Sequence, residues 1–352
     1  MADIIHVITD MGIGGAGILL SHLLSPPSKG KGSLVVLPQG SLLCTLFEEK
    51  DIPFRCLPFD GECSFSFHHL LAIGKILEET RPRLVVSHAS LSARIAAKRL
   101  SVPALAVRHC DTRIPPLSRI PYNAVTDATV ATSLSLGKHL RESGIQNVHV
   151  IENGYTPMGV PREEKKREAR RSLGIPEGRI AIGLSGRLSP IKGQRTALLA
   201  LAEAKRAGGC FTLCFLGDGE EKEALISHSH ALGIREEVRF LGFSRDVRPF
   251  YHAMDAHISC SLGSETSSLS LAEGMSAGCP TLASDTEGNR ARVAGGGRLF
   301  PPGDAKSLAS LFLTLLDKEE RRRLSGMARR RADELPTWQE MRAAYRRLFR
   351  AF

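Results

Sequence analysis

The sequence contains few aromatic residues and no long run of hydrophobic ones. Phe, Trp and Tyr make up 5% of the 352 residues, with a single Trp. Nucleic-acid-binding surfaces usually combine basic with aromatic side chains, so this scarcity argues against a nucleic-acid partner. No stretch reaches the roughly 18 apolar residues of a membrane-spanning helix. The first residues, MADIIHVITD, lack the basic region and apolar core of a signal peptide. We therefore predict a cytoplasmic protein.

The sequence also lacks the usual signatures of metal sites. Its cysteines form no CxxC pair, and no Asp-x-Asp or Walker A motif occurs. We therefore expect no metal and no cofactor. In a cytoplasmic protein the cysteines are predicted to be reduced core thiols. The eight cysteines are Cys44, Cys56, Cys63, Cys110, Cys210, Cys214, Cys260 and Cys279.

Acidic residues are fewer than basic ones, 37 against 47, which gives a net charge of +10. Such a charge favours anionic partners such as a nucleotide or a phospholipid surface. The densest basic runs are Glu163–Arg171 and Arg321–Arg331, and we interpret both as solvated helix faces. The length predicts about two domains.

The N-terminal half alternates predicted strands and helices. Asp3–Thr9 is a β-branched run, a glycine-rich segment follows at Asp10–Gly17, and a helical pattern begins at Ile18. The spacing Gly12-x-Gly14-x-x-Gly17 matches a dinucleotide fingerprint, but no acid ends the next strand, so we discount it. Further strands are predicted at 34–37, 54–57, 84–87, 104–108, 128–131 and 148–151, with helices at 41–50, 67–80 and 92–100. This order indicates a doubly wound, mostly parallel α/β sheet.

Polar residues follow three of these strands. They are Asp10, the pair Ser87–His88, and the run Arg108–Asp111. Functional groups of parallel sheets lie at the carboxyl ends of the strands. A histidine in such a place is commonly a structural hydrogen-bonding residue, but His109 has an Arg and an Asp beside it, which favours a functional role.

The second half repeats the alternation, beginning with the strand Ile180–Ser185. We place the first domain at residues 1–155, joined by the final helix 337–352, and the second at 156–336. Arg187 and Lys192 come directly after the first strand of the second domain. Together they could hold a diphosphate and neutralise its charge as it departs, in place of a metal. The alternative is that both are plain surface cations.

The stretch Ile258–Arg290 contains a strand, a Gly/Ser loop with Glu265, a helix from about Ser268 to Gly278, and a second strand at Pro280–Ala283. The start of such a helix favours an anion. Glu265 and Glu273 could accept hydrogen bonds from sugar hydroxyls, which suggests a nucleotide-sugar pocket. The alternative is that Ser270-x-x-Glu273 is a capping box and Glu265 an ordinary loop acid.

Five segments occur in an order and spacing that resemble one known family. They are Ser185–Gly193 (SGRL…KG), Leu216–Glu220 (LGDGE), Val238–Phe243 (VRFLGF), Glu265-x7-Glu273 and Pro302–Asp304 (PGD). They resemble the C-terminal domain of the large retaining GT-B glycosyltransferase family, which includes bacterial lipid mannosyltransferases, sucrose synthases and glycogen synthases. The N-terminal half resembles the family more loosely, at residues 14–17, 107–109 and 150–154.

The resemblance implies a fold and a reaction. The fold would be GT-B, with two doubly wound Rossmann-like domains facing a central cleft and a C-terminal helix crossing back to the N-terminal domain. The reaction would move a sugar from a UDP- or GDP-linked nucleotide-diphospho-sugar to an acceptor hydroxyl, with retention of configuration and without a metal. The product would be a bacterial cell-surface glycan or glycolipid, and the acceptor a glycan or a lipid-linked sugar.

The resemblance also implies roles for single residues. Arg187 and Lys192 would bind the donor diphosphate, helped by the amides of Leu269 and Ser270. Glu273 would hold the ribose, and Glu265 the transferred sugar. The base would contact Gly242, Phe243 and Ser244. His109 would lie near the donor sugar, and a loop of Gly14, Gly15 and Gly17 would close over the diphosphate. We expect Glu265, His109, Arg187 and Lys192 to carry the catalysis.

The sequence departs from the family pattern at Thr266–Ser268, where the family usually has Gly-Phe-Gly, so the sugar stays undetermined. Three alternatives remain. One is a GT-B sugar-nucleotide epimerase or a phosphorylase, although no cofactor lysine for the latter stands out. The second is a non-catalytic nucleotide-sugar-binding subunit. The third, nucleic-acid binding, is suggested by charge alone.

A separate hypothesis concerns anionic membranes. Basic residues on a predicted helix (Arg94, Lys98, Arg99) and in the loop from Arg113 to Ile120, which also carries Ile114 and Leu117, could rest peripherally on the inner face of a membrane. The same loop could instead be a lid over the acceptor.

Overall fold

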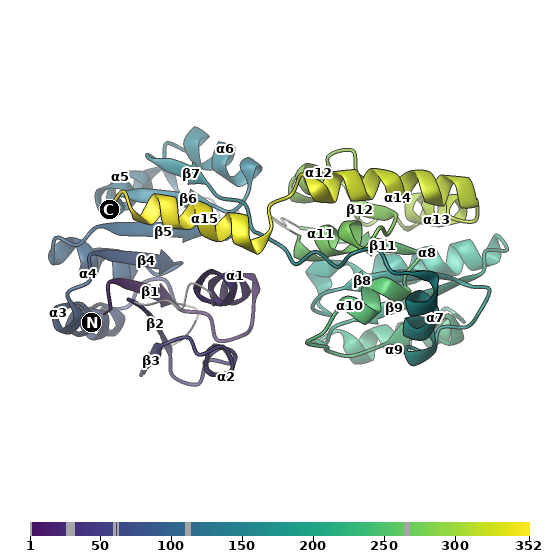
Figure 1. Ribbon diagram of the computed structural model, residues 1–352, viewed down its shortest axis with the longest axis horizontal. Coiled ribbons are helices and arrows are strands. Elements are labelled where there is room, and N and C mark those ends of the chain that lie inside the picture. The colour runs from purple at the N-terminus through teal and green to yellow at the C-terminus, as the bar shows by residue number, and fades with distance from the viewer. Residues whose placement is uncertain (1, 26–31, 59–60, 62, 110–113, 264–267) are drawn as a thin grey trace. The chain divides into compact units, whose positions relative to one another are not determined.

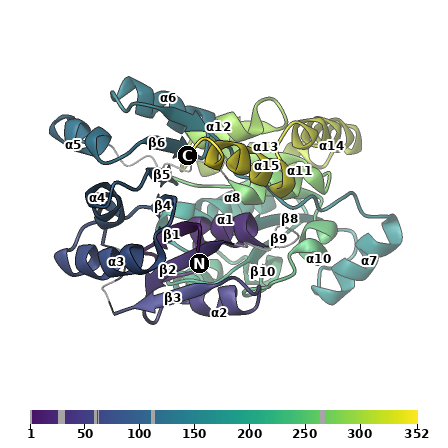
Figure 2. The same ribbon diagram turned by 60° about the vertical axis from the view of Figure 1, so that its left-hand side comes forward.

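The protein is described by a computed structural model that covers residues 2–25, 32–58, 61, 63–109, 114–263 and 268–352. The chain divides into two units (Figure 1). The first is Met1–Gly154 together with Pro336–Phe352, and the second is Tyr155–Leu335. Each unit has its own parallel sheet with helices on both faces (Figure 2).

The first unit is built on a seven-stranded parallel sheet in the order β3-β2-β1-β4-β5-β6-β7. The order turns at β1 and β4, which is the pattern of a doubly wound sheet. The strands are β1 Ile4–Ile8, β2 Ser33–Pro38, β3 Phe54–Leu57, β4 Leu84–His88, β5 Ala104–Arg108, β6 Ala128–Ala131 and β7 Val148–Val150.

The helices of this unit bury alternate residues of the strands. Ile5, Val7 and Val85 point to one face, where Ile73 of α3 and Ala97 of α4 cover them. The other face carries the intervening residues and is covered by α1 and α15. The helices are α1 Gly15–Leu24, α2 Leu43–Glu48, α3 Phe67–Thr80, α4 Leu91–Arg99, α5 Arg119–Ala124, α6 Leu134–Glu142 and α15 Trp338–Phe349.

The final helix α15 belongs to the first unit although the second unit precedes it in the chain (Figure 1). A capping box between Thr337 and Glu340 begins it. Trp338 stacks on His22 of α1, with ring centroids 4.1 Å apart, and Arg342 donates to the His22 carbonyl at 3.3 Å. The return of the last helix to the N-terminal unit is as the family resemblance implied.

The second unit has a six-stranded parallel sheet in the order β10-β9-β8-β11-β12-β13. Its first strand occupies the predicted residues Ile180–Ser185. The strands are β8 Ile180–Ser185, β9 Phe211–Leu216, β10 Val238–Phe240, β11 Ala256–Ser259, β12 Thr281–Ser284 and β13 Arg298–Phe300. The expected fold class, two doubly wound parallel-sheet units, is confirmed.

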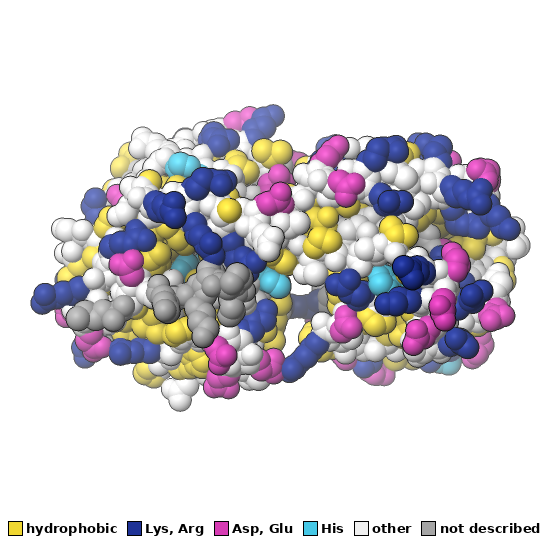
Figure 3. All heavy atoms as spheres, in the orientation of Figure 1, with side chains coloured by type: hydrophobic (Ala, Val, Ile, Leu, Met, Phe, Trp, Pro, Cys, Tyr) yellow, Lys and Arg dark blue, Asp and Glu magenta, His cyan; other side chains and the backbone are white. Residues whose placement is uncertain are grey.

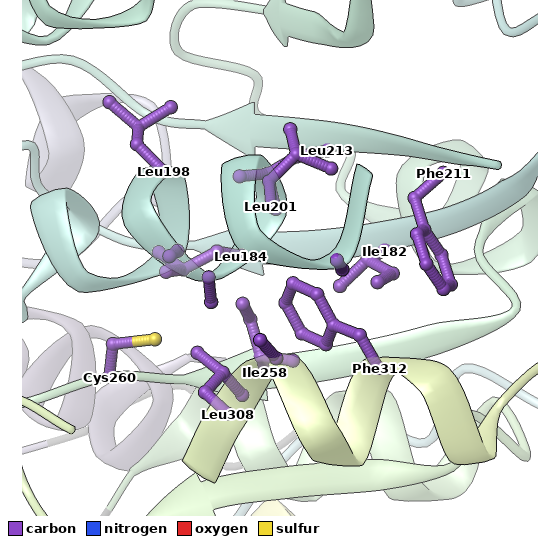
Figure 4. Packing of buried hydrophobic residues seen from close by; sticks show 14 of the residues in the cluster. Ile182, Leu184, Leu198, Leu201, Phe211, Leu213, Ile258, Cys260, Leu308 and Phe312 are labelled. Atoms are coloured by element: carbon purple, nitrogen blue, oxygen red, sulfur yellow. The ribbon is translucent and has the colours of Figure 1, made fainter. Parts of the chain in front are cut away.

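One face of this sheet packs on α8 and α13, and Figure 4 shows the buried side chains between them. Ile182 and Leu184 of β8 contact Leu201 of α8 and Phe312 of α13, all essentially inaccessible to solvent. The helices are α7 Glu163–Ser172, α8 Gln194–Arg206, α9 Lys222–Ala231, α10 Arg248–Ala253, α11 Leu269–Ser276, α12 Glu287–Val293, α13 Ala305–Thr314 and α14 Lys318–Asp333.

The two dense charge runs are surface helices, as predicted. They form α7 and α14, and α14 pairs Arg322 with Glu319 and Arg323 with Glu320 one turn apart. Figure 3 shows basic and acidic side chains interspersed around α7. In the part of the chain that the structure describes, no helix is long and apolar enough to cross a membrane.

The prediction that all cysteines are core thiols was wrong for part of the set. Cys214, Cys260 and Cys279 are buried, but Cys56 and Cys210 are exposed, and Cys44 and Cys63 are partly so. Cys56 lies on the edge strand β3, and Cys210 precedes β9, so one side of each faces solvent. Cys110 lies outside the described residues.

We predict that Gly154→Ala destabilises the first unit. A Cβ at Gly154 would lie 2.6 Å from the backbone nitrogen of Trp338, where α15 begins, so the backbone must shift. Overpacking of this kind costs about 1–3 kcal/mol. Thermal unfolding measures it. Gly74→Ala is the matched control, because a Cβ at Gly74 in α3 meets nothing within 4 Å; equal melting temperatures for the two variants would contradict the role of Gly154.

Candidate functional site

The candidate site of the second unit is the carboxyl edge of its sheet. Because all six strands are parallel, the segments that follow β8, β9, β10 and β11 leave the sheet at the same edge. The predicted residues Arg187, Lys192 and Gly242–Ser244 lie in these segments, and α11 begins after β11.

Glycines let the loops at this edge approach one another through their backbones. Gly217 has a φ of +134°, and a Cβ there would lie 2.1 Å from the Gly186 carbonyl oxygen. A Cβ at Gly219 would lie 2.3 Å from the Leu188 carbonyl oxygen. The Leu188 amide donates to the Asp218 carbonyl at 3.0 Å. Part of the glycine pattern seen in the sequence therefore serves to pack the β8 loop on the β9 loop.

The β8 loop also packs on the segment after β11. Gly193 has a φ of +67°, and a Cβ there would lie 2.0 Å from the carbonyl oxygen of Cys260. The Leu262 amide donates to the Ile191 carbonyl at 2.8 Å. Lys192, which ends the 3-10 turn Pro190–Lys192, is thereby held beside the segment that leads to α11.

Arg187 extends from the β8 loop into solvent. In the part of the chain that the structure describes, no carboxylate forms an ion pair with it. Buried Gln194 holds the Arg187 backbone by donating to its carbonyl at 2.8 Å. A guanidinium without an internal counter-ion, on a backbone that is fixed, is suited to binding an anion.

The helix α11 presents its first amides at the same edge. The N-cap residue is Ser268, and its side chain makes no capping hydrogen bond to the first turn. The backbone groups of Leu269 and Ser270 thus lie at a helix start that Ser268 does not cap with its side chain. Ser268 Oγ lies 3.1 Å from Ser270 Oγ. The predicted residue Glu265 lies outside the described residues.

The capping-box interpretation of Ser270 and Glu273 was wrong, because the N-cap residue is Ser268, two residues before Ser270, and Glu273 is bonded elsewhere. Tyr251 of α10 donates to Glu273 Oε2 at 2.9 Å. Tyr251 Oη lies 2.8 Å from Ser185 Oγ, and Ser185 Oγ lies 3.3 Å from His257 Nε2. Since Tyr251 donates to the carboxylate, the chain runs from His257 through Ser185 and Tyr251 to Glu273.

Glu273 changes between its neutral and its charged form near neutral pH. Burial raises the pKa of its carboxyl to about 7, while the Tyr251 hydroxyl and the nearby Arg292 oppose that rise. Burial also lowers the pKa of His257 to about 3, so that ring is neutral. Tyr251, Ser185 and His257 were not predicted as site residues. Ser185 opens the SGRL motif, but no local signal marked Tyr251 or His257.

The segment after β10 completes this edge. Gly242 has a φ of +70°, and its carbonyl accepts the Gly217 amide at 2.8 Å. Phe243 is 70% exposed, and Ser244 Oγ donates to the Asp246 carbonyl at 2.8 Å. The structure therefore brings Gly242 beside the β9 loop and leaves a large aromatic ring exposed next to it.

The glycine-rich segment of the first unit differs from the expectation. The helix α1 begins at Gly15, so Gly15 and Gly17 belong to its first turn and do not form a loop. Gly17 is a packing residue, because a Cβ there would lie 2.3 Å from the Leu43 side chain. Around Gly14 and Gly15 there is space, with only Asp10 Oδ2 at 3.9 Å from a Cβ placed at Gly14. Of the three predicted glycines, two could therefore still face a ligand.

His109 follows β5 in the first unit and continues a row of histidines. His88 Nδ1 lies 3.0 Å from His109 Nε2, and His88 Nε2 lies 3.5 Å from His6 Nδ1. Burial lowers the pKa of His6 to about 3 and that of His109 to about 4, and the His88 pKa also falls well below its usual value. All three rings are neutral at neutral pH. Asp111 lies outside the described residues.

One of the basic groups assigned to a membrane surface is buried. Arg94 is buried, with its guanidinium 4.4 Å above the Tyr122 ring and a 2.7 Å bond to Thr126. It is a structural residue, so the prediction for Arg94 was wrong. In the loop, Leu117 is 93% exposed and Ile120 is 80% exposed. Arg113 lies outside the described residues.

Among the residues that the structure describes, no group of three or more His, Cys, Asp or Glu side chains is placed to hold a metal ion.

Two family models match the chain. Residues 165–331 match the model described as glycosyl transferases group 1, and residues 38–157 match the model described as glycosyltransferase family 4. The first match lies within the second unit, and the second match covers most of the first unit and ends three residues beyond its boundary at Gly154. Together they cover most of both sheets.

Several curated proteins similar to this chain are bacterial glycosyltransferases. A lipopolysaccharide core biosynthesis glycosyltransferase, LpsE of Rhizobium meliloti, is 29% identical over 54% of each chain. A phosphatidyl-myo-inositol mannosyltransferase of Mycobacterium leprae is 31% identical over 42% of this chain and 40% of its own. The chain thus matches about half the length of these relatives.

Among solved structures, the fold resembles that of HepE from Anabaena crystallised in complex with UDP. The TM-score is 0.87 at 21% identity, and the match covers 100% of both chains. Sucrose-phosphate synthase from Thermosynechococcus elongatus matches with a TM-score of 0.76 at 17% identity, over 99% of this chain and 100% of its own. These likenesses establish the fold.

We predict that the first unit loses stability as the pH falls below about 6.5. His6 stays neutral in the folded state down to a pKa of about 3, whereas in the unfolded chain it takes a proton near 6.5. A depressed pKa of a base thus gives stability that is present above 6.5 and lost on acidification, by up to about 1.4 kcal/mol per pH unit and site. Denaturant unfolding between pH 7.5 and 5 measures it. His6→Phe should flatten the dependence by about one proton; the same replacement at exposed His68 should not.

Proposed function

Since the chain belongs to the GT-B glycosyltransferases, we propose that it moves a sugar from a nucleotide-diphospho-sugar to an acceptor hydroxyl. The observation behind this proposal is the hydrogen-bonded chain from Ser185 through Tyr251 to Glu273. This chain joins Ser185, two residues before the exposed Arg187, to Glu273 on the helix α11, which begins at the same sheet edge. Cations, amides and a carboxylate are thereby brought to one place, as a nucleotide diphosphate requires.

The diphosphate is the part of the donor that this edge suits best. Arg187 and Lys192 supply positive charge, and the first amides of α11 at Leu269 and Ser270 add donors and the positive end of the helix dipole. As the bond from the sugar to the phosphate breaks, negative charge grows on the departing nucleotide diphosphate. The same groups stabilise that charge, so the reaction needs no metal for this purpose.

Glu273 suits the ribose. Its carboxylate is held by the Tyr251 hydroxyl on one oxygen, and a carboxylate has further lone pairs to accept hydrogen bonds from the two ribose hydroxyls. Buried Tyr251 is fixed in turn by Ser185 at the end of β8. The Ser185 and Tyr251 hydroxyls thus fix the position of the Glu273 carboxylate oxygens before the nucleotide binds.

The base would lie against the segment Gly242–Ser244, where the exposed Phe243 ring offers an apolar surface. A UDP-linked or GDP-linked donor fits this account, and the solved relative HepE holds UDP. Glu265 is assigned to the transferred sugar and His109 to the same sugar, both through the family resemblance. Arg187 and Lys192 act on the leaving group.

We propose that the transfer retains the anomeric configuration. The acceptor oxygen would attack the sugar from the face that the diphosphate leaves, the sugar–phosphate bond would break, and a leaving phosphate oxygen would take the acceptor proton. The names of the similar proteins favour an acceptor in cell-surface glycan or glycolipid synthesis. A lipid-linked acceptor would give the exposed Leu117 and Ile120 a surface to contact.

The second candidate is a sugar-nucleotide epimerase, which shares the fold and needs no acceptor. Product analysis separates the two: an epimerase releases free nucleotide and an altered sugar in water alone, whereas a transferase forms a new glycosidic bond. The solvent-facing Leu117 and Ile120 favour a transferase, because an apolar acceptor would give them a partner.

We predict that UDP- or GDP-sugars raise the melting temperature of the chain, with or without EDTA. Arg187→Ala should weaken nucleotide binding by about 10- to 150-fold, since a hydrogen bond to a charged group contributes about 1.5–3 kcal/mol. Arg195→Ala is the matched control, because Arg195 pairs with Glu221 at 2.8 Å. Binding that needs a metal, or that survives in Arg187→Ala unchanged, would refute the diphosphate site.

We predict that nucleotide affinity rises with pH through about 7, where Glu273 ionises and becomes the better acceptor. Tyr251→Phe removes the hydroxyl that stabilises the carboxylate, so the pKa of Glu273 and the rise in affinity should move to higher pH. Calorimetric titration with UDP or GDP between pH 5.5 and 8.5 measures both. A pH-independent affinity, equal in Glu273→Gln and the unaltered chain, would exclude Glu273 as a ribose ligand.

A further inference from the structure

We infer that His88 is a positioning residue, which holds the ring of His109 through a buried chain of imidazoles that begins at His6. The inference rests on the proposed function at one point, the assignment of His109 to the sugar transfer. It goes beyond that function by naming the two residues behind His109.

The sheet register places the three rings in a row. In the parallel pairing Ile8 lies opposite His88, and His88 lies opposite Val107. Because residues two apart along a strand share a face, His6 and His109 are on the same face of the sheet as His88. The row therefore runs diagonally across β1, β4 and β5 towards the carboxyl edge.

The row is sealed from solvent at its inner end. His6 and His88 are buried, and the ring of Phe349 from α15 lies edge-on to His6 at a centroid distance of 5.9 Å. Both nitrogens of His88 are engaged, one with His6 and one with His109. Its ring cannot turn without giving up a bond in a place that water does not reach.

Neutral rings make the chain directional. A neutral imidazole carries one N–H and one lone pair, so the two bonds of His88 must run in the same direction along the row. The nitrogen of His109 that faces His88 is therefore a donor or an acceptor according to the tautomer of His88. Orientation of one imidazole by a partner behind it is a common device for setting its tautomer.

A purely structural role does not explain why buried positions 6 and 88 carry polar rings, because burying a polar group costs free energy. Apolar residues fill the opposite face of the same strands, and Ile or Val at positions 6 and 88 would avoid burying polar rings. The polar row ends at the edge of the sheet where functional groups of such folds lie.

Ring nitrogen NMR on the intact chain tests the inference without any substrate. Two-bond proton–nitrogen spectra should show His109 in one neutral tautomer. His88→Phe should change the balance of the two His109 tautomers, and His88→Gln, which keeps a donor and an acceptor, should restore the original form. His68→Phe, at an exposed histidine, should leave the His109 signals unchanged. A single unchanged tautomer in a folded His88→Phe variant would overturn the inference.

Turnover of the nucleotide sugar gives the second readout. His88→Phe should lower kcat by about 10- to 100-fold, the size of effect seen when metal-ligating histidines lose an orienting partner, and leave KM for the donor within about threefold. A kcat equal to that of the unaltered chain, in a variant that melts cooperatively, would make His88 a packing residue. If no transfer occurs in any variant, the proposed function fails, while the NMR result still decides the role of His88.

A different observation carries a second proposal, a redox-sensitive pair. Cys44 Sγ of α2 and Cys56 Sγ of β3 lie 3.2 Å apart, both as free thiols. We propose that they form a reversible disulfide with a low-molecular-weight disulfide as the oxidant. A disulfide has its sulfurs about 2.05 Å apart, so bond formation needs a movement of about 1 Å.

The order of the two steps follows from exposure. Cys56 is exposed, so its thiolate attacks oxidised glutathione and releases one glutathione. Cys44 then attacks the mixed disulfide and releases the second. Two protein thiols and one oxidised glutathione become one protein disulfide and two reduced glutathiones. Burial and the adjacent Cys56 raise the pKa of the Cys44 thiol to about 11, so Cys44 carries less thiolate than an ordinary cysteine and is not the first to attack.

The disulfide would act on the glycine-rich segment of the first unit. Directly before α2, Ser41 Oγ donates to the Asp10 carbonyl at 2.7 Å and the Leu42 amide donates to the Met11 carbonyl at 2.8 Å. Tying α2 to β3 would hold these contacts and slow the opening of residues 10–14.

Thiol mapping tests the pair. The intact chain is equilibrated with mixtures of reduced and oxidised glutathione, alkylated and digested. We expect a Cys44–Cys56 disulfide in the unaltered chain, and slower amide exchange at residues 10–14 when it forms. Cys44→Ser should instead trap glutathione on Cys56, as should happen at exposed, solitary Cys210. A stable glutathione adduct on Cys56 in the unaltered chain, with no disulfide, would overturn the proposal.

Discussion

The hydrogen-bonded chain from His257 through Ser185 and Tyr251 to Glu273 is the interaction on which the candidate site depends. It joins β8, β11, α10 and α11 at one edge of the second sheet. Because every member is at least partly buried, breaking one bond would leave a polar group without water to replace it. The chain therefore fixes where α11 begins relative to the β8 loop, and with it the place of Arg187 relative to the first amides of the helix.

Glycines make this arrangement possible. Gly193, Gly217 and Gly219 allow three loops to touch through their backbones, at distances no other residue would allow. The result is a set of loops whose cation, Arg187, is exposed while its backbone is held. A site of this kind binds a polyanion without reorganising, and preorganised charges are the ones that stabilise a developing negative charge best.

The two units use polar burial differently. In the second unit the buried chain ends on a carboxylate whose ionisation lies near neutral pH, so its hydrogen-bonding behaviour changes with small shifts in environment. In the first unit the row of His6, His88 and His109 is neutral over the whole physiological range. These rings stay uncharged, and the direction in which their hydrogen bonds run along the row depends on geometry rather than on pH.

The sequence by itself determined the strand and helix alternation, the doubly wound class, the family, and the loop positions of Arg187 and Lys192. These follow from local periodicity and from motifs a few residues long. It did not show that Gly17 packs on Leu43, that Arg94 is buried over Tyr122, or that Tyr251 and His257 support Glu273. Those contacts join residues far apart in the chain, and only the tertiary structure decides them, because burial and a hydrogen-bond partner are properties of the folded neighbourhood rather than of the residue.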